Sequence, residues 1–526
     1  MTGHSFPPAL KQRAIAALLG VAAFALVLVI TDPVGPGLDP DAMAYMGSAE
    51  SVAAHATYRL PTAEWTSADS TEPLAHFPPG YSTALAIPIR LGMSPPQGAR
   101  LVEAIAAFVT TFTLFLLVSA ATSAFVGALF VIALFSMTSM HEVHVSVLSE
   151  PMFLACLALA LYAMVRRPDH PLWAGIPAAV GIMTRYAGAS LVGAAAIWTF
   201  MRPGTLAQRS RRAAIAVFPA VVLEAIWVIR TRASQGAEEI RSFAIYGHLG
   251  KTLAQGGQTL SAWLIPDPAL DSDAIPYRGA LAIAAGCSLA ILVGIGAWHA
   301  WRSAPAPSSC HPGQREGSAP AAATAWRLLL AAFLQAACYI AVVMASRIFA
   351  DEAIPLDERI LSPALLLAMT IAAIGLAIWW RGTRLDIARL AVSCGLLGWW
   401  CAAALATYSE AHFALDWGSD FAGQQWRRSE LLAWARADGA RHPLYSNWPA
   451  AVYFYLHRPA RELPKQRDLE PETLREFADT VRVRNGRVML FNAPTGEYPS
   501  NVAMTRAPGL RVVARVADGI VLAASR

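Results

Sequence analysis

Residues 14–31 read AIAALLGVAAFALVLVIT, an apolar run without a charged side chain. Its length approaches the ~20 residues that an α-helix needs to cross a bilayer. The run is long for the apolar core of a secretory signal, and no small-residue cleavage site follows it. We therefore expect a retained transmembrane helix. Similar runs recur along the chain up to about residue 407.

The composition agrees with this expectation. The chain is 56% hydrophobic and 15% charged, and its mean hydropathy is +0.43, whereas soluble domains carry about 25% charged residues. The sequence therefore predicts a polytopic α-helical membrane protein with about 11 transmembrane helices. We expect these helices at residues 14–31, 102–119, 124–139, 150–165, 172–185, 188–201, 213–230, 279–301, 327–346, 360–380 and 386–407.

Basic residues distinguish two sets of loops between these helices. One set carries Lys11, Arg13, Arg166, Arg167, Arg202, Arg209, Arg211, Arg212, Arg302, Arg381 and Arg384. The other set is mainly acidic, with Asp39, Asp41, Glu64, Asp69, Glu72, Glu142 and Glu150. Because Lys and Arg collect in cytoplasmic loops, we expect the N-terminus in the cytoplasm and the tail after residue 408 outside. The formal net charge of +5 reflects this topology and suggests no nucleic-acid partner.

The tail differs in character from the rest of the chain. SELLAWARADGA (429–440) has the pattern of an amphipathic helix, and PLYSN (443–447) and VMLFN (488–492) resemble short strands. LRVVARVADGIVLAA (510–524) predicts a hairpin that turns at Asp518-Gly519. Alternating helices and strands predict a small C-terminal α/β domain, residues 409–526.

The longest outer segment before the tail, about residues 32–100, opens with LDPDAMAYMGSAE (38–50). Asp39 is placed to cap a helix whose first residue is Pro40. Asp41, Tyr45 and Ala49 would then share one helix face. Asp41 is not needed as the cap, although an acid in the first turn also suits the helix dipole. Spacing alone therefore assigns Asp41 no role.

The same segment continues with EPLAHFPPGYSTALAIP (72–88), in which His76 and Tyr81 flank a Pro-Pro-Gly turn. The turn forces an extended chain and then a change of direction before an apolar helix. A simple return of the chain into the membrane would explain it as well.

These motifs occur in a fixed order with four others. The four are SEPMFLACLALALYAMVRR (149–167), AGIPAAVGIMTRYAG (174–188), DERILSPALLLAM (357–369) and YSNWPAAVYFYLHRPARELP (445–464). Together they resemble the bacterial GT-C glycosyltransferases of the PMT/ArnT (PMT-2) type. The resemblance implies an enzyme of the bacterial inner membrane that moves a sugar from a polyprenyl-phosphate donor to a lipid, glycan or protein acceptor on the outer face. It also implies a GT-C-like transmembrane catalytic domain, residues 1–408, and an extracytoplasmic tail.

Three acids correspond to functional positions of that family. The resemblance identifies Asp41 with the essential acid of the first outer loop and Tyr45 with its companion, and it leaves Asp39 as a second candidate. Glu150 matches an acid at the outer end of a later span. A carboxylate in reach of the acceptor can act as general base, worth ~10²–10⁴-fold. Direct displacement at the sugar would invert its anomeric centre.

The resemblance places basic residues at two further positions, Arg185 in TRY and Arg359 in ERILSP, and Arg347 is a third candidate. Arginine suits a donor phosphate because its planar fork binds two oxygens and remains charged. Each arginine could instead anchor a helix end or pair inside the bundle. His76 and Tyr81 complete the expected substrate-binding set.

HEVH (141–144) invites a metal hypothesis. The two histidines are three residues apart in an expected short outer loop and lack the HExxH spacing of zincins. Some relatives in this superfamily use a divalent ion and others need none. A site for Mg²⁺ or Mn²⁺ made from Asp41, Glu150, His141 and His144 therefore stays open, and no cofactor is assigned.

The segment 234–266 contains amphipathic patches with Phe243, Tyr246 and Trp263. It predicts a helix lying on the membrane surface, or a flap over the polyprenyl tail of the donor. Two other functions would also fit a protein with many spans. One is a transporter or flippase for a lipid-linked glycan, and the other is a non-catalytic scaffold for envelope assembly.

Overall fold

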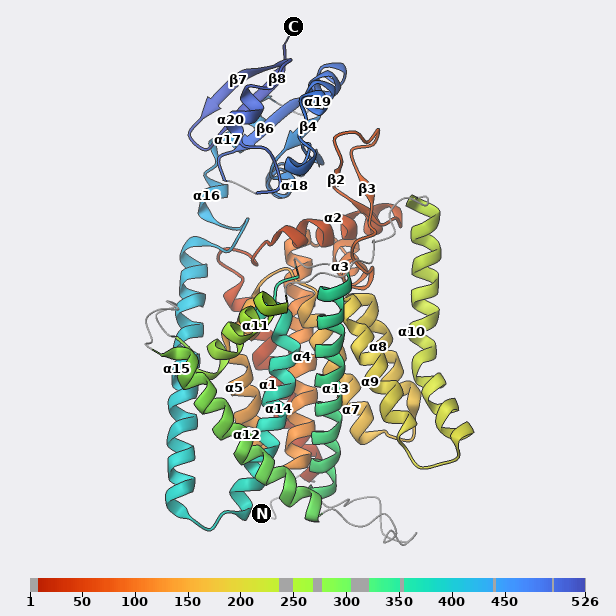
Figure 1. Ribbon diagram of the computed structural model, residues 1–526, viewed down its shortest axis with the longest axis vertical. Helices are drawn as coiled ribbons and strands as arrows, with labels where there is room; N and C mark the ends of the chain where they lie inside the picture. Colours follow the sequence, from red (N-terminus) through yellow and green to blue (C-terminus); the bar gives the residue numbers. More distant parts are fainter. Residues whose placement is uncertain are drawn as a thin grey trace, which may run out of the picture. The chain divides into compact units, whose positions relative to one another are not determined.

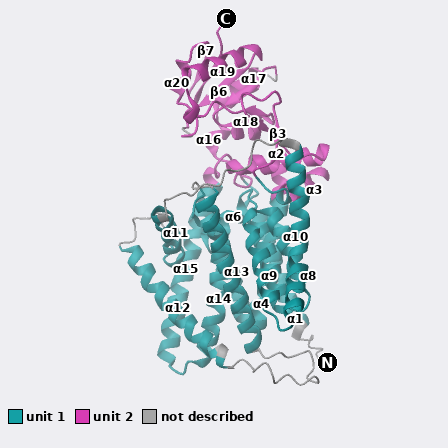
Figure 2. Ribbon diagram, turned by 45° about the vertical axis from the view of Figure 1, so that its right-hand side comes forward, with its two compact units in different colours: residues 1–33, 77–81, 100–415 teal, residues 34–76, 82–99, 416–526 magenta. Residues whose placement is uncertain are grey.

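The computed structural model describes residues 8–235, 249–267, 277–303, 321–350, 354–438, 441–493 and 496–525. The chain divides into two compact units (Figure 2). The helical unit comprises residues 1–33, 77–81 and 100–415, and the mixed unit comprises residues 34–76, 82–99 and 416–526. The domain boundary expected at residue 408 stays a prediction, because these compact units do not follow the order of the chain.

The helical unit consists of long apolar helices and several short ones (Figure 1). They are α1 Pro8–Ile30, α4 Pro95–Ala121, α5 Ala124–Phe135, α6 Thr138–Val145, α7 Glu150–Arg166, α8 Pro171–Thr184, η1 Tyr186–Gly188, α9 Ala189–Phe200, α10 Leu206–Gln235, α11 Leu249–Leu264, α12 Arg278–Ser303, α13 Ala321–Phe349, α14 Glu358–Gly382 and α15 Asp386–Trp417. Among the described residues, seven helices are long and apolar enough to cross a membrane, or eight if the bent pair α5–α6 forms one span. The chain is therefore a multi-pass membrane protein.

Each expected span coincides with a helix or, at 124–139, with the bent pair α5–α6, and three of the other helices are short. The spans expected at 150–165, 172–185 and 188–201 correspond to α7, α8 and α9, which have 17, 14 and 12 residues. They are shorter than the ~20 residues of a simple membrane crossing. The exact number of spans stays a prediction.

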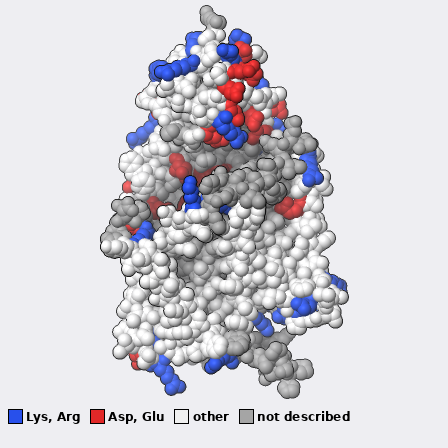
Figure 3. All heavy atoms as spheres, in the orientation of Figure 1, with Lys and Arg blue, Asp and Glu red and all other residues white. Residues whose placement is uncertain are grey.

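The helical unit buries one large apolar core and exposes other apolar side chains. Phe115, Phe153 and Leu366 lie in the core and are fully buried. On the outer helices, Phe218 is 64% exposed and Ile291 62% exposed. Figure 3 shows a band of uncharged side chains across this unit, with Lys and Arg at its lower margin. Exposed apolar residues in helices of this length are typical of lipid contact.

The span expected at 124–139 is not a straight helix. α5 ends at Phe135, Met137 is extended (φ −89°, ψ 137°), and α6 runs at 68° to α5. HEVH therefore lies in helix α6, and its expected position in a short outer loop was wrong. The bend lies at Ser136-Met137, and periodicity alone does not define the angle between two consecutive helices.

The mixed unit is built around a six-stranded sheet. Its strands are β2 Thr62–Ala63, β5 Ala460–Arg461, β4 Leu444–Ser446, β6 Arg487–Phe491, β8 Gly519–Ala524 and β7 Leu510–Val516, in that order across the sheet. The first four strands are parallel to one another, and the pairs β6–β8 and β8–β7 are antiparallel. The expected hairpin at Asp518-Gly519 is the β7–β8 pair.

Helices cover both faces of this sheet. The other elements of the unit are α2 Pro40–His55, β1 Arg59–Leu60, β3 Glu72–Pro73, α3 Gly80–Arg90, α16 Gln424–Arg427, α17 Glu430–Asp438, α18 Pro449–Leu456, η2 Gln466–Asp468, α19 Pro471–Val483 and α20 Asn501–Thr505. Met489 packs with residues of α17 and α18 in one cluster, and its neighbour Val488 packs with residues of α19 in another. This alternation follows from the two-residue period of a strand.

The first outer segment and the tail form one structure in the mixed unit. β2 from the first segment pairs with β5 from the tail, and Thr62 Oγ1 donates to the Ala460 carbonyl at 2.8 Å. The Arg461 guanidinium donates to the carbonyls of Ser67, Ala68 and Asp69 at 2.5–2.9 Å. The tail thus holds the backbone of the first outer segment.

Candidate functional site

A buried carboxylate joins two arginines in the helical unit. Glu150 is 1% exposed, and its Oε1 lies 2.5 Å from Arg185 Nη1 and 2.6 Å from Arg359 Nε. Arg185 Nη1 also donates to Ser149 Oγ at 3.0 Å. The arginine side chains are 15% and 16% exposed. We call Glu150, Arg185 and Arg359 the arginine cluster.

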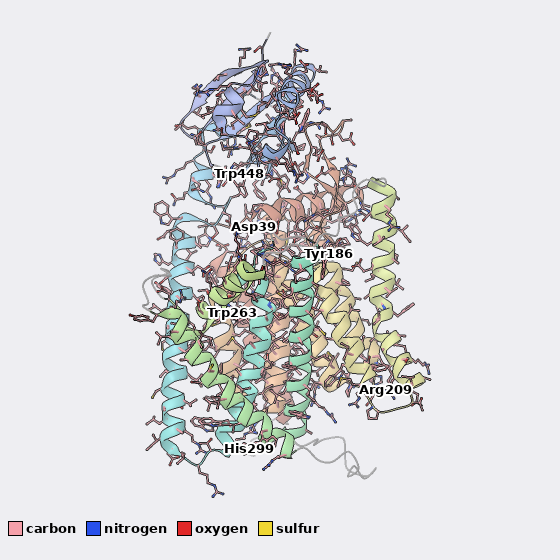
Figure 4. The ribbon with its side chains drawn as sticks, in the orientation of Figure 1. Asp39, Tyr186, Arg209, Trp263, His299 and Trp448 are labelled. Atoms are coloured by element: carbon pink, nitrogen blue, oxygen red, sulfur yellow. The ribbon has the colours of Figure 1, made fainter. Side chains whose placement is uncertain are left out.

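Each member of the arginine cluster lies where a helix begins or ends. Glu150 is the first residue of α7, directly before Pro151. Arg185 is extended (φ −148°, ψ 139°) and ends α8. Arg359 is in the first turn of α14, which Asp357 caps. Tyr186, the next residue after Arg185, lies at one end of the helical unit, and Arg209 and His299 lie at the other (Figure 4).

The arginine cluster joins one carboxylate to two guanidiniums. A carboxylate that already accepts two charge-assisted hydrogen bonds is a weak proton acceptor, so Glu150 is better suited to holding the arginines than to general base catalysis. Two guanidiniums on one anchor are suited to an anionic ligand such as a phosphate.

Neighbouring helices fix the start of α14. Glu358 Oε2 accepts hydrogen bonds from Thr138 Oγ1 at 2.8 Å and Ser139 Oγ at 2.6 Å, both on α6. Trp263 of α11 donates to Ser139 Oγ at 3.0 Å, and Tyr339 of α13 donates to the Ile360 carbonyl at 2.5 Å. Three separate helices therefore restrict where Arg359 can lie.

The third arginine candidate connects two helices. Arg347 Nε donates to Thr252 Oγ1 at 2.7 Å and so connects α13 to α11. α11 supplies the helix expected in segment 234–266, and its Thr259 also bonds to the Leu356 carbonyl. Phe243 and Tyr246 lie outside the described residues. Its expected role in substrate binding stays a prediction.

The two residues that flank the Pro-Pro-Gly turn differ in burial. His76 is exposed, whereas Tyr81 is fully buried and its hydroxyl donates to Glu103 of α4. A Cβ at Gly80 would lie 2.5 Å from the Met183 carbonyl oxygen, so the turn packs against the last turn of α8. Sequence reasoning did not identify Glu103, although an acid inside an apolar helix is itself a signal of function.

His141 and His144 are both buried in α6. His144 Nδ1 bonds to the Met140 carbonyl at 2.8 Å, and neither Nε2 has a hydrogen-bond partner among the described residues. Among all the residues that the structure describes, no three His, Cys, Asp or Glu side chains form a group that could hold a metal. Glu150 fits a metal poorly, because two arginines already bind its Oε1.

The acids of the first outer segment belong to the mixed unit. Asp39 accepts a hydrogen bond from the Asp41 N–H at 2.8 Å and Pro40 follows it, so the capping role of Asp39 is confirmed. Asp41 is in the first turn of α2 and half-buried. Tyr45, one turn further, is 2% exposed. Their catalytic and binding roles stay predictions.

The same helix is connected to the tail by a pair that sequence reasoning did not identify. Tyr453 of α18 donates to Glu50 Oε2 of α2 at 2.5 Å. Burial raises the pKa of the Tyr453 hydroxyl well above its usual value, and the neighbouring Glu50 charge raises it further. The phenol therefore remains a neutral donor, which keeps α2 and α18 together.

Comparisons with known proteins identify a family with a similar sequence and structures with a similar fold. Residues 76–228 match the PMT_2 family model, described as dolichyl-phosphate-mannose-protein mannosyltransferase, and no curated protein matches the chain. Arabinofuranosyltransferase AftD from Mycobacteria has a TM-score of 0.51 at 13% identity, over 98% of this chain and 42% of that one. The Archaeoglobus fulgidus oligosaccharyltransferase has a TM-score of 0.50 at 13% identity, over 93% and 70%.

ArnT from Cupriavidus metallidurans, solved with undecaprenyl phosphate, gives a TM-score of 0.48 at 15% identity, over 96% of this chain and 97% of that one. The sequence match covers the Pro-Pro-Gly turn, Glu150 and Arg185, and the structural similarity covers nearly the whole chain. This chain is a multi-pass membrane protein whose fold is similar to those of an oligosaccharyltransferase and an arabinofuranosyltransferase, and its residues 76–228 match the dolichyl-phosphate-mannose-protein mannosyltransferase family model.

Proposed function

We propose that this protein transfers a sugar from a polyprenyl-phosphate donor to an acceptor in the cell envelope. The observation that carries the proposal is the arginine cluster, in which one buried carboxylate anchors two guanidiniums at one end of the helical unit. The match to a mannosyltransferase family over residues 76–228 supports the reaction class. The proposal names the class of donor and the class of acceptor, and it specifies no particular sugar or acceptor molecule.

The arginine cluster would act on the leaving group. When the bond between the sugar carbon C1 and the phosphate oxygen breaks, the departing lipid phosphate gains negative charge. Fixed cations placed where charge develops stabilise the transition state and require little reorganisation. Arg185 and Arg359 can supply these cations because Glu150 holds them in place before the donor arrives.

The other half of the reaction is activation of the acceptor. In our proposal Asp41 takes the proton from an acceptor hydroxyl or amine as that atom bonds to C1 and the phosphate leaves. One bond forms and one breaks, so the anomeric centre inverts. Asp41 is preferred over Asp39, because the Asp39 carboxylate is engaged in capping α2. Glu150 is assigned to holding arginines, and no step of this mechanism requires a metal.

The proposed location follows from charge. Arg209 lies at the end of the helical unit opposite Tyr186 (Figure 4), and it belongs to the loops expected in the cytoplasm. The arginine cluster would then face the outer side of a bacterial inner membrane, where the donor sugar is displayed. This orientation places the N-terminus inside and the tail outside.

The test uses full-length protein in lipid nanodiscs with a panel of polyprenyl-phosphate sugars, and follows transfer by mass spectrometry. We expect Asp41→Asn to lower transfer at least ~10²-fold and Arg185→Gln to weaken donor binding. Arg209→Gln is the matched control, because it also removes a guanidinium but at the opposite end. A parallel arm with EDTA tests for a metal.

Two results would count against the proposal. If Asp41→Asn transfers sugar like the wild type, the base is another residue. If no donor is consumed but lipid-linked sugar crosses the bilayer, the protein is a transporter; the helix breaks at Met137 and Arg185 favour this alternative, because interrupted helices often mark transport sites.

A further inference from the structure

We propose that Glu103 is a positioning residue for the arginine cluster. It holds the Phe77–Tyr81 turn and the segment before Glu150 in one arrangement, and thereby sets where Arg185 meets the donor phosphate. This inference rests on the proposed function. Glu103 acts through its neighbours and is not placed on the donor.

Glu103 is a buried hub. It lies in the apolar stretch RLVEAIAAFV (100–109) of α4 and is 1% exposed. The Tyr81 hydroxyl donates to its Oε1, and the backbone of Leu148 lies near its carboxylate. Its Oε2 has no hydrogen-bond partner among the described residues. Through this one side chain, α4 is connected to two segments far apart in the sequence.

The first connection reaches Arg185 through the turn. Tyr81 is fully buried, so its bond to Glu103 fixes the turn in place. Gly80 packs against Met183, since an added Cβ would lie 2.5 Å from the Met183 carbonyl oxygen. Arg185 follows two residues later, where α8 ends. A shift of the turn therefore changes the backbone that carries the Arg185 side chain.

The second connection reaches the same arginine from the opposite side. Leu148 is followed by Ser149, whose Oγ accepts a hydrogen bond from Arg185 Nη1 at 3.0 Å. Glu150 comes next and bonds to Arg185 at 2.5 Å. Glu103 thus lies against the backbone just before both residues that hold this guanidinium. Both segments that position Arg185 meet at one carboxylate.

A carboxylate at this position is difficult to explain by stability alone. Ionisable side chains within membrane-spanning helices are costly and usually serve a function. An apolar pair at Glu103 and Tyr81 would fill the same space without an unpartnered oxygen, and replacing both partners of a buried hydrogen bond is often nearly neutral. The polar pair is better explained by the fixed geometry that it gives the turn.

The decisive variant is Tyr81→Phe/Glu103→Leu, which removes both partners. We expect it to unfold at nearly the temperature of the wild type, whereas Glu103→Leu alone unfolds earlier because the Tyr81 hydroxyl loses its acceptor. We further expect the double variant to bind undecaprenyl phosphate about 10- to 10²-fold more weakly in nanodiscs, the effect of a small misplacement. If Glu103 had a purely structural role, the double variant would bind undecaprenyl phosphate like the wild type as soon as its stability matched the wild type.

Thr110→Val is the matched control. Thr110 is also in α4, is fully buried, and its hydroxyl has no hydrogen-bond partner in the described part of the chain. We expect this variant to bind undecaprenyl phosphate like the wild type. If the double variant does not fold, Tyr81→Phe alone is measured in the same way.

Arg185→Gln, measured in parallel, separates this inference from the proposed function. If Arg185→Gln loses binding and the double variant keeps it, Glu103 is not a positioning residue and the proposed function stands. If wild type and Arg185→Gln bind undecaprenyl phosphate equally, the arginine cluster is no phosphate site and both proposals fail.

Discussion

Replacing Glu150 by Gln tests the anchor of the arginine cluster directly. The substitution keeps the size of the side chain but removes the negative charge that faces Arg185 and Arg359. Those two guanidiniums are 15% and 16% exposed, so water can compensate for the lost charge only in part. We expect the variant to be less stable and to bind polyprenyl phosphate more weakly, although its local charge becomes more positive.

The magnitude follows from the contacts. Two opposite charges about 4 Å apart attract by about 4 kcal/mol at an effective dielectric constant of about 20, and Glu150 makes two such contacts, at 2.5 and 2.6 Å. The desolvation of a fully buried carboxylate offsets a large part of this attraction. Removing one partner of a buried pair typically lowers the free energy of unfolding by about 3–5 kcal/mol. We expect a loss in that range.

The assay is equilibrium unfolding in mixed micelles, followed by circular dichroism, for Glu150→Gln, Arg185→Gln and the double variant. Because both side chains belong to one cluster, the losses should not add, and the coupling should be about 0.5–3 kcal/mol. Additive losses, or a Glu150→Gln variant as stable as the wild type, would refute the assignment of Glu150 as anchor. Tighter phosphate binding by Glu150→Gln would show that charge matters more than orientation.

Three further predictions concern single contacts. Asp39→Ala should lower the free energy of unfolding by about 0.5–2 kcal/mol because α2 loses its cap, and Asp39→Ser, which can still cap, should not. Gly80→Ala should cost about 1–3 kcal/mol, because its Cβ would press on the Met183 carbonyl; Gly193→Ala, where the Cβ has open space, serves as control in the same unfolding assay. Tyr453→Phe should lose about 1.5–3 kcal/mol at neutral pH. Since the folded pKa of Tyr453 is raised, its contribution is complete below about pH 10, the usual tyrosine pKa, and is lost as pH rises further; melting curves of wild type and variant should converge in alkali.

Local signals predicted many elements of this fold. The Asp39-Pro40 start of α2 and the hairpin at Asp518-Gly519 both depend on neighbouring residues. The pairing of β2 with β5 was not predictable in this way. Each of these strands has two residues, and the Thr62–Ala460 hydrogen bond spans 398 positions. Such a pairing has no local pattern, so the mixed unit could not be derived from the sequence.

The candidate site was predictable as parts but not as an arrangement. Glu150, Arg185 and Arg359 were each singled out from a separate motif, and each arginine had the alternative of an anchor at a helix end. Only the structure shows that both guanidiniums meet one carboxylate oxygen. That meeting makes Glu150 better suited to holding cations than to acting as a base, because a carboxylate that already accepts two charge-assisted hydrogen bonds is a weak proton acceptor.

Glu103 was missed for a different reason, and its signal was available. Residues that match a family motif commonly touch substrate, whereas Glu103 reaches the arginine cluster through Tyr81 and the backbone of Leu148. Physical reasoning offers another criterion, because an acid in a membrane-spanning helix needs a partner or a function. Arginines at helix ends can reach polar surroundings by extending their side chains, but a glutamate two turns inside α4 cannot. In membrane proteins of this kind, buried ionisable side chains that cannot reach water are therefore strong candidates for functional residues.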